Sequence, residues 1–158
     1  MNDVVVHSMQ HLNDGDLASI AAYLKTLPPN NAATPYAYDA AKALFNGEAP
    51  TRGAQIYVDR CAGCHRTDGK GSGQVFPSLA GNSVLQTDDA TSAIHIVLSG
   101  STLPQRRLRL PPLTMAPYAR ILTDQDIADV VSFIPTSWGN AGAVVTSSKV
   151  TALRKLAK

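Results

Sequence analysis

The sequence has few aromatic, charged and cysteine residues, and these shortages limit what the chain can be. Aromatic residues make up 6% of its 158 residues, charged residues make up 16%, and there are two cysteines. A net charge of +2 is too small to indicate a nucleic-acid partner. No run of about 18 consecutive apolar residues occurs, so the sequence encodes no transmembrane helix. A core with so few aromatic side chains would gain from a large apolar cofactor at its centre.

Both cysteines lie in one motif, Cys61-Ala62-Gly63-Cys64-His65. The pattern C-x-x-C-H is typical of covalent haem attachment. Two thiols three positions apart lie on adjacent turns of a helix, so they can form thioether bonds with the two vinyl groups of one porphyrin. His65 follows directly, and its imidazole can turn under the iron as the proximal axial ligand. The motif therefore predicts one covalently bound haem c.

Two other interpretations of the cysteine pair are less well supported. A thioredoxin-like redox pair is expected within a βαβ pattern, and no clear strand alternation flanks this site. A structural zinc site needs four ligands, usually from two close pairs. Apart from His65, the remaining histidines are widely separated, at His7, His11 and His95.

The rest of the chain is predicted to form short helices joined by turns. We expect helices over residues 12–27, 38–45, 88–98 and 123–134, one that opens at residues 50–51 and carries Cys61, and a last short helix capped by Thr146 or Ser147. Thr123-x-x-Asp126 resembles a capping box, with Asp in place of the usual Glu. Residues 103–117 contain four prolines and should form an extended loop. The predicted fold class is all-α.

A weak internal repeat indicates how the chain is organised. Several residues recur 110 positions later: Leu12, Asp14, Asp16, Ala18 and Thr26 match Leu122, Asp124, Asp126, Ala128 and Thr136, and Leu17, Tyr23 and Leu24 match Ile127, Phe133 and Ile134. Either two unrelated amphipathic helices share similar caps, or the chain contains parts of two domains of one kind. We adopt the second interpretation: residues 1–35 end one domain and include a linker, residues 36–142 form the haem domain, and residues 143–158 are a tail.

Residues 4–6 are too short for a signal-peptide core, so we expect a mature form, a fragment or an expression product.

Met115 is the predicted ligand on the opposite side of the iron from His65. It is preferred over Met1 and Met9 because it lies 50 residues after His65 in the proline-rich loop, where prolines fix φ and stiffen the chain. A rigid loop can hold a weak thioether ligand at little entropic cost, and thioether ligation raises the reduction potential. Met115 could instead be an ordinary core methionine. His95, in an apolar helical run, is the rival ligand.

The motifs in combination resemble a known family. They follow in this order: Arg52-Gly53-Ala54-Gln55-Ile56-Tyr57, Cys61-x-x-Cys64-His65, Phe76-Pro77-x-Leu79-Ala80-Gly81-Asn82, Met115-Ala116-Pro117-Tyr118 and Ser137-Trp138-Gly139-Asn140. The chain resembles class I cytochrome c. More closely, it is similar to the C-terminal haem domain of the three-haem cytochrome c subunit of bacterial membrane-bound dehydrogenases for alcohols, gluconate and sugars, including FAD-dependent glucose dehydrogenases. This resemblance implies a class I cytochrome c fold around one covalently bound haem c.

The resemblance also implies roles for individual residues. Cys61 and Cys64 would be thioether anchors, and His65 and Met115 would be the axial iron ligands. The carbonyl of Pro77 would accept a hydrogen bond from the other ring nitrogen of His65, and the pocket would be lined by Leu79, Tyr57, Tyr118 and Phe133. These four side chains could equally be general core residues. Pro135 stands where relatives usually have arginine, so the preceding helix should end or kink there.

The function implied by the resemblance is one-electron transfer by a non-catalytic subunit. Electrons would come from a dehydrogenase catalytic subunit and from other haem domains of the same subunit, and would pass to ubiquinone or another acceptor. The family implies a periplasmic location, with membrane association in the full complex. The alternatives are a haem-dependent redox enzyme such as a peroxidase, or a partner-binding fragment with no working cofactor. Residues 1–5 would correspond to the axial-methionine segment of a preceding haem domain.

Three arginines precede Met115 in the proline-rich loop, at Arg106, Arg107 and Arg109. They are either solvated loop residues or propionate partners, or they help to dock an acidic electron-transfer partner or an anionic membrane surface. Exposed charges of this kind act mainly on encounter rates and are screened by salt.

Overall fold

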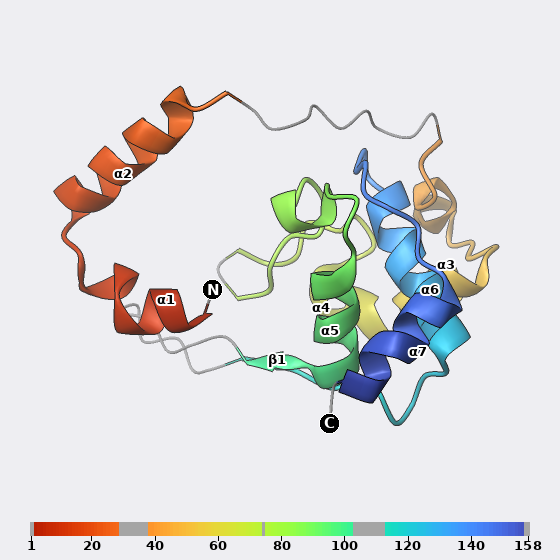
Figure 1. The fold of residues 1–158 in the computed structure, drawn as a ribbon. Helices are drawn as coiled ribbons and strands as arrows, with labels where there is room; N and C mark the ends of the chain where they lie inside the picture. The colour runs from red at the N-terminus through yellow and green to blue at the C-terminus, as the bar shows by residue number, and fades with distance from the viewer. Residues whose placement is uncertain (1, 29–37, 74, 103–112, 157–158) are drawn as a thin grey trace. The chain divides into compact units, whose positions relative to one another are not determined.

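The computed structural model describes residues 2–28, 38–73, 75–102 and 113–156 (Figure 1). The chain divides into two compact units. One comprises Met1–Ala32 with Thr102–Met115, and the other comprises Ala33–Ser101 with Ala116–Lys158. Most of the predicted loop over residues 103–117, with its three arginines, lies outside the described residues. None of the described helices is long and apolar enough to cross a membrane.

The smaller unit contains the N-terminal helices. Helix α1 spans Asn2–His7, a 3-10 helix spans Met9–His11, and α2 spans Asp14–Thr26. The helix predicted over residues 12–27 is thus confirmed, and it begins because the side chain of Asn13 accepts a hydrogen bond from the backbone N–H of Asp16 at 2.9 Å. No helix was expected before residue 12. Strand β2, Thr114–Met115, pairs with β1, Ser101–Thr102.

The larger unit is built from short helices around α6, which spans Asp124–Phe133. Helix α3 (Arg52–Ile56), α5 (Thr91–Ser99) and α7 (Ser147–Leu156) all pack against α6 (Figure 1). Most of the buried apolar side chains come from these four helices and from the turn after α3, and others come from Ala41, Leu44 and Ile134. The largest apolar side chains with less than 2% exposed are Tyr57, Ile94, Leu98, Ile127, Val130, Val131 and Val150. The two strands have two residues each, so the described chain has the predicted all-α class.

Helix α6 can cross α3 closely because α3 carries a glycine at the crossing. A Cβ atom on Gly53 would lie 2.4 Å from the backbone oxygen of Asp129 and 2.9 Å from Cβ of Phe133. Any larger residue would push the two helices apart. Gly53 therefore sets how closely α3, which the cysteine motif follows in the chain, approaches α6.

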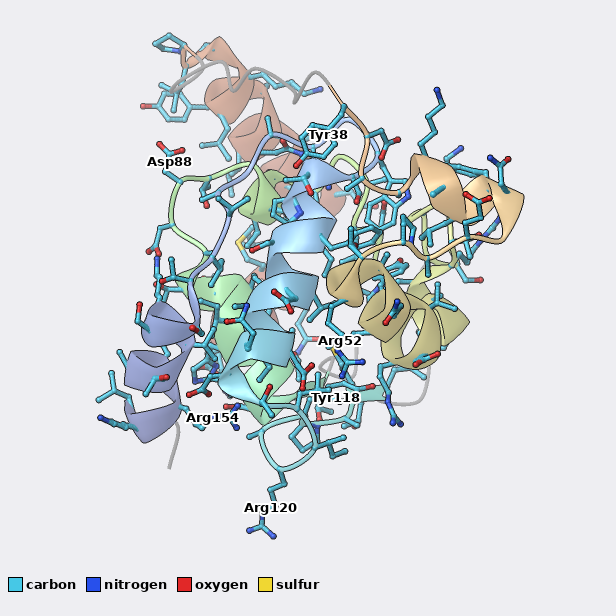
Figure 2. All side chains as sticks on the ribbon, turned by 90° about the vertical axis from the view of Figure 1, so that its right-hand side faces the viewer. Tyr38, Arg52, Asp88, Tyr118, Arg120 and Arg154 are labelled. Atoms are coloured by element: carbon cyan, nitrogen blue, oxygen red, sulfur yellow. The ribbon has the colours of Figure 1, made fainter. Side chains whose placement is uncertain are left out.

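Polar contacts fix the N-terminal end of α6 (Figure 2). The predicted capping box is present, with Thr123 and Asp126 bonded to each other's backbone N–H groups. Arg52 of α3 lies 2.8 Å from Asp126. Arg154 of α7 donates to Asp124 and, at 2.9 Å, to the carbonyl of Leu122. These contacts hold α3 and α7 against the same end of α6.

Two predicted helices differ from those observed, and a predicted break is present. Residues 38–45 form only a 3-10 helix, Lys42–Asn46, because the Asp39 carboxylate accepts from the Ala41 N–H and holds the chain in a turn. Similarly, Asp89 accepts from the backbone of Thr91, and α5 begins at Thr91 rather than at residue 88. The expected break at Pro135 is confirmed, since α6 ends at Phe133 and a 3-10 helix, Ile134–Thr136, follows.

Candidate cofactor site

The cysteine motif lies across a change in helix type. Helix α3 ends at Ile56, a π-helical turn spans Tyr57–Cys61, and the short α4 spans Ala62–His65. The helix predicted to open at residues 50–51 and to carry Cys61 is present, but it changes from α to π and back to α along its length. A π turn widens the helix by one residue and often occurs at functional positions. Here the turn ends at Cys61, and Cys64 and His65 follow on α4.

Both cysteines are free thiols with different exposure. Cys61 is partly buried and Cys64 is exposed. Burial, with a smaller contribution from neighbouring Cys64, raises the pKa of Cys61 to about 11. Burial thus favours the protonated form of the Cys61 thiol, whereas a nucleophilic cysteine needs a lowered pKa. No βαβ unit surrounds the pair in the described part of the chain.

His65 is held in a single orientation. Its side chain is buried, with 9% exposed, and Nδ1 lies 2.9 Å from the carbonyl oxygen of Pro77. A carbonyl oxygen can only accept, so the proton of the neutral ring is on Nδ1 and the lone pair is on Nε2. This is the tautomer that a metal-binding imidazole needs. Its backbone oxygen also accepts from the N–H of Gly71 at 3.0 Å.

The loop that presents the Pro77 carbonyl depends on two glycines. The carbonyl of Gly69 accepts from the N–H groups of Leu79 at 2.7 Å and Ala80 at 3.0 Å. Gly71 has φ of +62°, and a Cβ there would lie 2.2 Å from the Phe76 oxygen and 2.7 Å from the Pro77 oxygen. Only glycine permits both the left-handed backbone and this close approach. This contact with Pro77 is not evident from the sequence.

An aromatic cluster supports the motif from the α6 side. Tyr57 is fully buried, and its ring centroid lies 5.4 Å from Phe133 and 5.1 Å from Trp138. The Tyr57 hydroxyl donates to the Arg66 carbonyl at 2.7 Å, and burial raises its pKa. Trp138 donates through Nε1 to the Thr67 carbonyl at 3.0 Å. Trp138 is the single tryptophan of the sequence, and this is the one local signal that points to its role.

Tyr118 joins the segment after Met115 to the start of the haem motif. Its hydroxyl donates to the Arg60 carbonyl at 2.9 Å, and its backbone N–H donates to the Val97 carbonyl at 3.0 Å. The side chain is partly exposed, and burial is the main cause of its raised pKa. Leu79 is partly buried. The structure thus places Tyr57, Leu79, Tyr118 and Phe133 in the same unit as His65.

The two candidate ligands opposite His65 lie in different units. Met115 ends β2 and is partly buried, and it belongs to the smaller unit, so its role as a ligand stays a prediction. His95 lies on α5 in the larger unit, with its side chain exposed. Among the described residues, no group of three or more His, Cys, Asp or Glu side chains could hold a metal ion.

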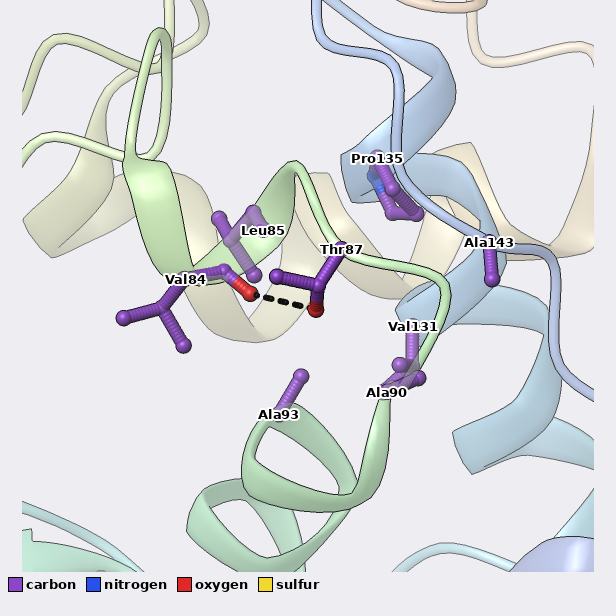
Figure 3. Close-up of a pocket in the computed structure, with 8 residues that line it drawn as sticks. All are labelled: Val84, Leu85, Thr87, Ala90, Ala93, Val131, Pro135 and Ala143. Carbon is purple, nitrogen blue, oxygen red and sulfur yellow. Dashed lines mark hydrogen bonds between the residues drawn. The ribbon is translucent and has the colours of Figure 1, made fainter. Parts of the chain in front are cut away.

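A separate small pocket lies between α5, α6 and the segment after Asn82 (Figure 3). It is mostly apolar and has room for about one water molecule. Its lining residues are Val84, Leu85, Thr87, Ala90, Ala93, Val131, Pro135 and Ala143. None of them belongs to the cysteine motif, so this pocket is not the cofactor site.

Comparison with known proteins gives a consistent result. A family model described as cytochrome c matches residues 50–138. The cytochrome c subunit of gluconate 2-dehydrogenase from Pantoea cypripedii is 46% identical over 160 residues, which covers 98% of this chain and 36% of that protein. The cytochrome c subunit of alcohol dehydrogenase (quinone) from Gluconacetobacter polyoxogenes is 45% identical over 159 residues, covering 98% of this chain and 34% of that protein.

A more distant relative has the same kind of name. The fructose dehydrogenase cytochrome subunit from Gluconobacter japonicus is 30% identical over 173 residues, covering 98% of this chain and 36% of that protein. The chain therefore spans about a third of the length of these curated relatives.

Proposed function

The chain belongs to the cytochrome c family, and we propose that residues 36–142 bind one covalent haem c and transfer single electrons. Membership of this family implies covalent haem c, and Cys61 and Cys64 fit its attachment motif. The observation that carries the proposal is the orientation of His65, whose Nδ1–H is bonded to Pro77 directly after the two thiols. When bound, haem c supplies an iron centre that accepts and donates one electron.

Each residue of the site has a distinct task in this proposal. The thiols of Cys61 and Cys64 would form the thioether bonds, and Nε2 of His65 would bind the iron. The hydrogen bond from Nδ1 to Pro77 fixes the plane of the ring and increases the electron density on Nε2. Met115 would supply the thioether ligand, which would make the iron less open to small molecules. Tyr57, Leu79, Tyr118 and Phe133 line the pocket and exclude water.

We further propose that the chain is the C-terminal haem domain of a three-haem cytochrome c subunit. The support is that the relatives above are named cytochrome c subunits of dehydrogenases and are about three times as long as this chain. Residues 1–35 then end a preceding cytochrome c domain and include a linker, and residues 143–158 form a tail with a helix. The sequence repeat and the helix α2 agree with this division.

In the complete subunit, electrons arrive from a dehydrogenase catalytic subunit and from the other haem domains. They leave to ubiquinone or another acceptor, and the name alcohol dehydrogenase (quinone) of one relative supports a quinone. The complex is periplasmic and membrane-associated, as in the family that the sequence resembles. The comparisons offer no support for a peroxidase, so electron transfer is the function that the site supports.

A potentiometric titration of the haem-loaded protein, followed by visible absorption, tests the proposal. A one-electron transition between two six-coordinate spectra is expected. Met115→Ala should abolish the weak red absorption band of Fe(III)–methionine bonding and lower the potential, because thioether ligation raises it. Met9→Ala, which changes a partly buried methionine in the 3-10 helix, is the matched control and should alter neither. A parent protein without covalently bound haem would overturn the proposal.

A further inference from the structure

Asn140 is a buried amide with every hydrogen-bonding group in use. Its side chain is 1% exposed. Oδ1 accepts from the N–H of Gly81 at 2.9 Å and from Nε2 of Gln86 at 2.6 Å, and Nδ2 donates to the carbonyls of Leu79 and Ile134, both at 3.1 Å. A side-chain amide has two donor hydrogens and an oxygen with two lone pairs, so these four bonds exhaust it. A buried amide with all of its hydrogen bonds made holds its partners in one arrangement, because any other arrangement would leave a buried polar group unpaired.

The partners of Asn140 belong to separate parts of the chain. Leu79 and Gly81 lie in the segment that follows Pro77, whereas Ile134 directly follows α6 and begins the 3-10 helix Ile134–Thr136. Gln86 completes the link, because its Oε1 accepts from the N–H of Ala141 at 2.7 Å. Asn140 therefore ties the segment after Pro77 to the end of the most buried helix.

The same segment is held on its other side by the glycine loop. The carbonyl of Gly69 accepts from the N–H groups of Leu79 and Ala80. Leu79 is thus fixed at both of its backbone polar groups, by Gly69 at its nitrogen and by Asn140 at its oxygen. Pro77, whose oxygen accepts from Nδ1 of His65, lies only two residues earlier.

We propose that Asn140 is a positioning residue for His65. By holding Leu79 and Gly81, Asn140 keeps the Pro77 carbonyl at hydrogen-bond distance from Nδ1 of His65. It thereby sets how much electron density Nε2 of His65 can give to the iron. This inference rests on the proposed role of His65 as the axial ligand. A firm bond at Nδ1 raises the basicity of the ligand and favours the ferric state. Loosening the segment should therefore expose the Nδ1–H to solvent and raise the reduction potential.

Asn82 offers a comparison within the same segment. Its Nδ2 donates to the Ser78 carbonyl at 3.0 Å and its Oδ1 accepts from the Val84 N–H at 3.0 Å. Both partners are near neighbours in the chain, and Asn82 is only partly buried. Asn82 stabilises a local turn, but it does not connect the segment to α6.

The test compares Asn140→Asp with Asn82→Asp in the haem-loaded protein. The new side chain at position 140 keeps the shape of the amide. When it ionises, its oxygens face the carbonyl oxygens of Leu79 and Ile134 and repel them. Exchange of the His65 Nδ1–H in D₂O, followed by NMR of the reduced protein, should become about tenfold faster, the factor that the loss of about one net hydrogen bond represents. The potential should rise, and both changes should grow as the pH increases.

Two controls separate positioning from general stability. Asn82→Asp should change exchange and potential less than Asn140→Asp does, because it acts on the Ser78 carbonyl but leaves the links to Ile134 and Gln86 in place. Val150→Ala removes methyl groups from a fully buried position on α7, so it lowers stability while leaving both readouts unchanged. If Asn140→Asp yields no holoprotein, Gln86→Ala, which removes one of the four partners of Asn140, should give a smaller change in the same direction.

The proposal is overturned if the Asn140→Asp holoprotein, or Gln86→Ala in its place, matches the parent in exchange and potential. It is also overturned if Val150→Ala shifts both readouts as much as these variants do. A parent protein that lacks covalent haem or histidine ligation would instead refute the proposed function, so the two failures are distinguishable.

Discussion

Helices α2 and α6 have similar sequences but very different surroundings. Each begins with a capped turn, in which Asn13 bonds the N–H of Asp16 and Thr123 bonds that of Asp126. Yet no residue of α2 is buried in the described structure, whereas α6 buries five: Ile127, Ala128, Val130, Val131 and Phe133. The local pattern determines that a helix forms, and neighbouring elements determine what it buries.

The burial of α6 depends on residues far away in the chain. Helices α3, α5 and α7 pack against it, and Gly53 allows the closest of these approaches. In α2, by contrast, Tyr23 is 65% exposed at the position that corresponds to Phe133, which is 4% exposed. Corresponding positions of the repeat are therefore exposed in α2 and buried in α6.

Truncation of these two aromatic residues should give the largest difference. Phe133→Ala should lower the free energy of unfolding by about 3–5 kcal/mol, because it leaves a cavity beside Tyr57 and Trp138. Tyr23→Ala should change it by less than about 0.5 kcal/mol, as expected for an exposed side chain. Urea denaturation followed by circular dichroism measures both. Equal losses would show that α2 is as deeply packed as α6.

A glycine-to-alanine substitution should also have different effects on stability at the α3–α6 crossing and in α2. Gly53→Ala should cost about 1–3 kcal/mol, because the new Cβ meets the backbone of α6. Gly15→Ala in α2 meets only the flexible side chain of Asn13 and should be neutral or slightly stabilising, since alanine favours helix. The same denaturation series gives the answer. A neutral Gly53→Ala variant would mean that α3 and α6 are not closely packed.

Removal of the two caps should have smaller effects. Thr123→Ala should lower the free energy of unfolding by about 1 kcal/mol, because α6 is part of the cooperative core. Asn13→Ala removes a similar bond, but it should only loosen the first turn of α2. Amide hydrogen exchange at Asp16 and Asp126, combined with the denaturation midpoint, separates local from global opening. A shift of the midpoint by Asn13→Ala would contradict this view.

Acidification should weaken the contact between α6 and α7. The pKa of Asp124 is lowered from its ordinary value, first by the hydrogen bond from Thr151 and then by Arg154. A carboxyl group that is more acidic in the folded state contributes stability above its unfolded pKa, and this contribution is lost as the pH falls through the folded pKa. Stability should therefore decline below about pH 4. In the Asp124→Asn variant the free energy of unfolding should decline less with falling pH than in the parent, and in Thr151→Val the decline should be intermediate. If both variants show the same pH dependence as the parent, Asp124 is not the cause.

The sequence was most informative where its signals are local. The C-x-x-C-H motif, the caps of α2 and α6 and the break at Pro135 each depend on a few neighbouring residues. The helix over residues 38–45 was wrongly predicted because Asp39 bonds the backbone N–H groups of Ala41 and Trp138, and the second of these lies 99 positions away.

The support for His65 was the least predictable part of the site. The bond to Pro77 was expected only from the family resemblance, and not from spacing. The roles of Gly71 and Asn140 follow from close approaches to segments that periodicity and composition cannot place. Asn140, for example, bonds Leu79 at a separation of 61 residues. Such contacts become visible only once the chain is folded.

The central claim is that this chain carries one haem, attached at Cys61 and Cys64. Intact mass under denaturing conditions tests it most directly, because only a covalently bound haem survives unfolding of the protein. The parent, expressed with haem-attachment enzymes, should gain the mass of one haem, and a Cys61→Ala/Cys64→Ala variant should gain none. A parent without added mass, or a double variant that keeps it, would contradict the account.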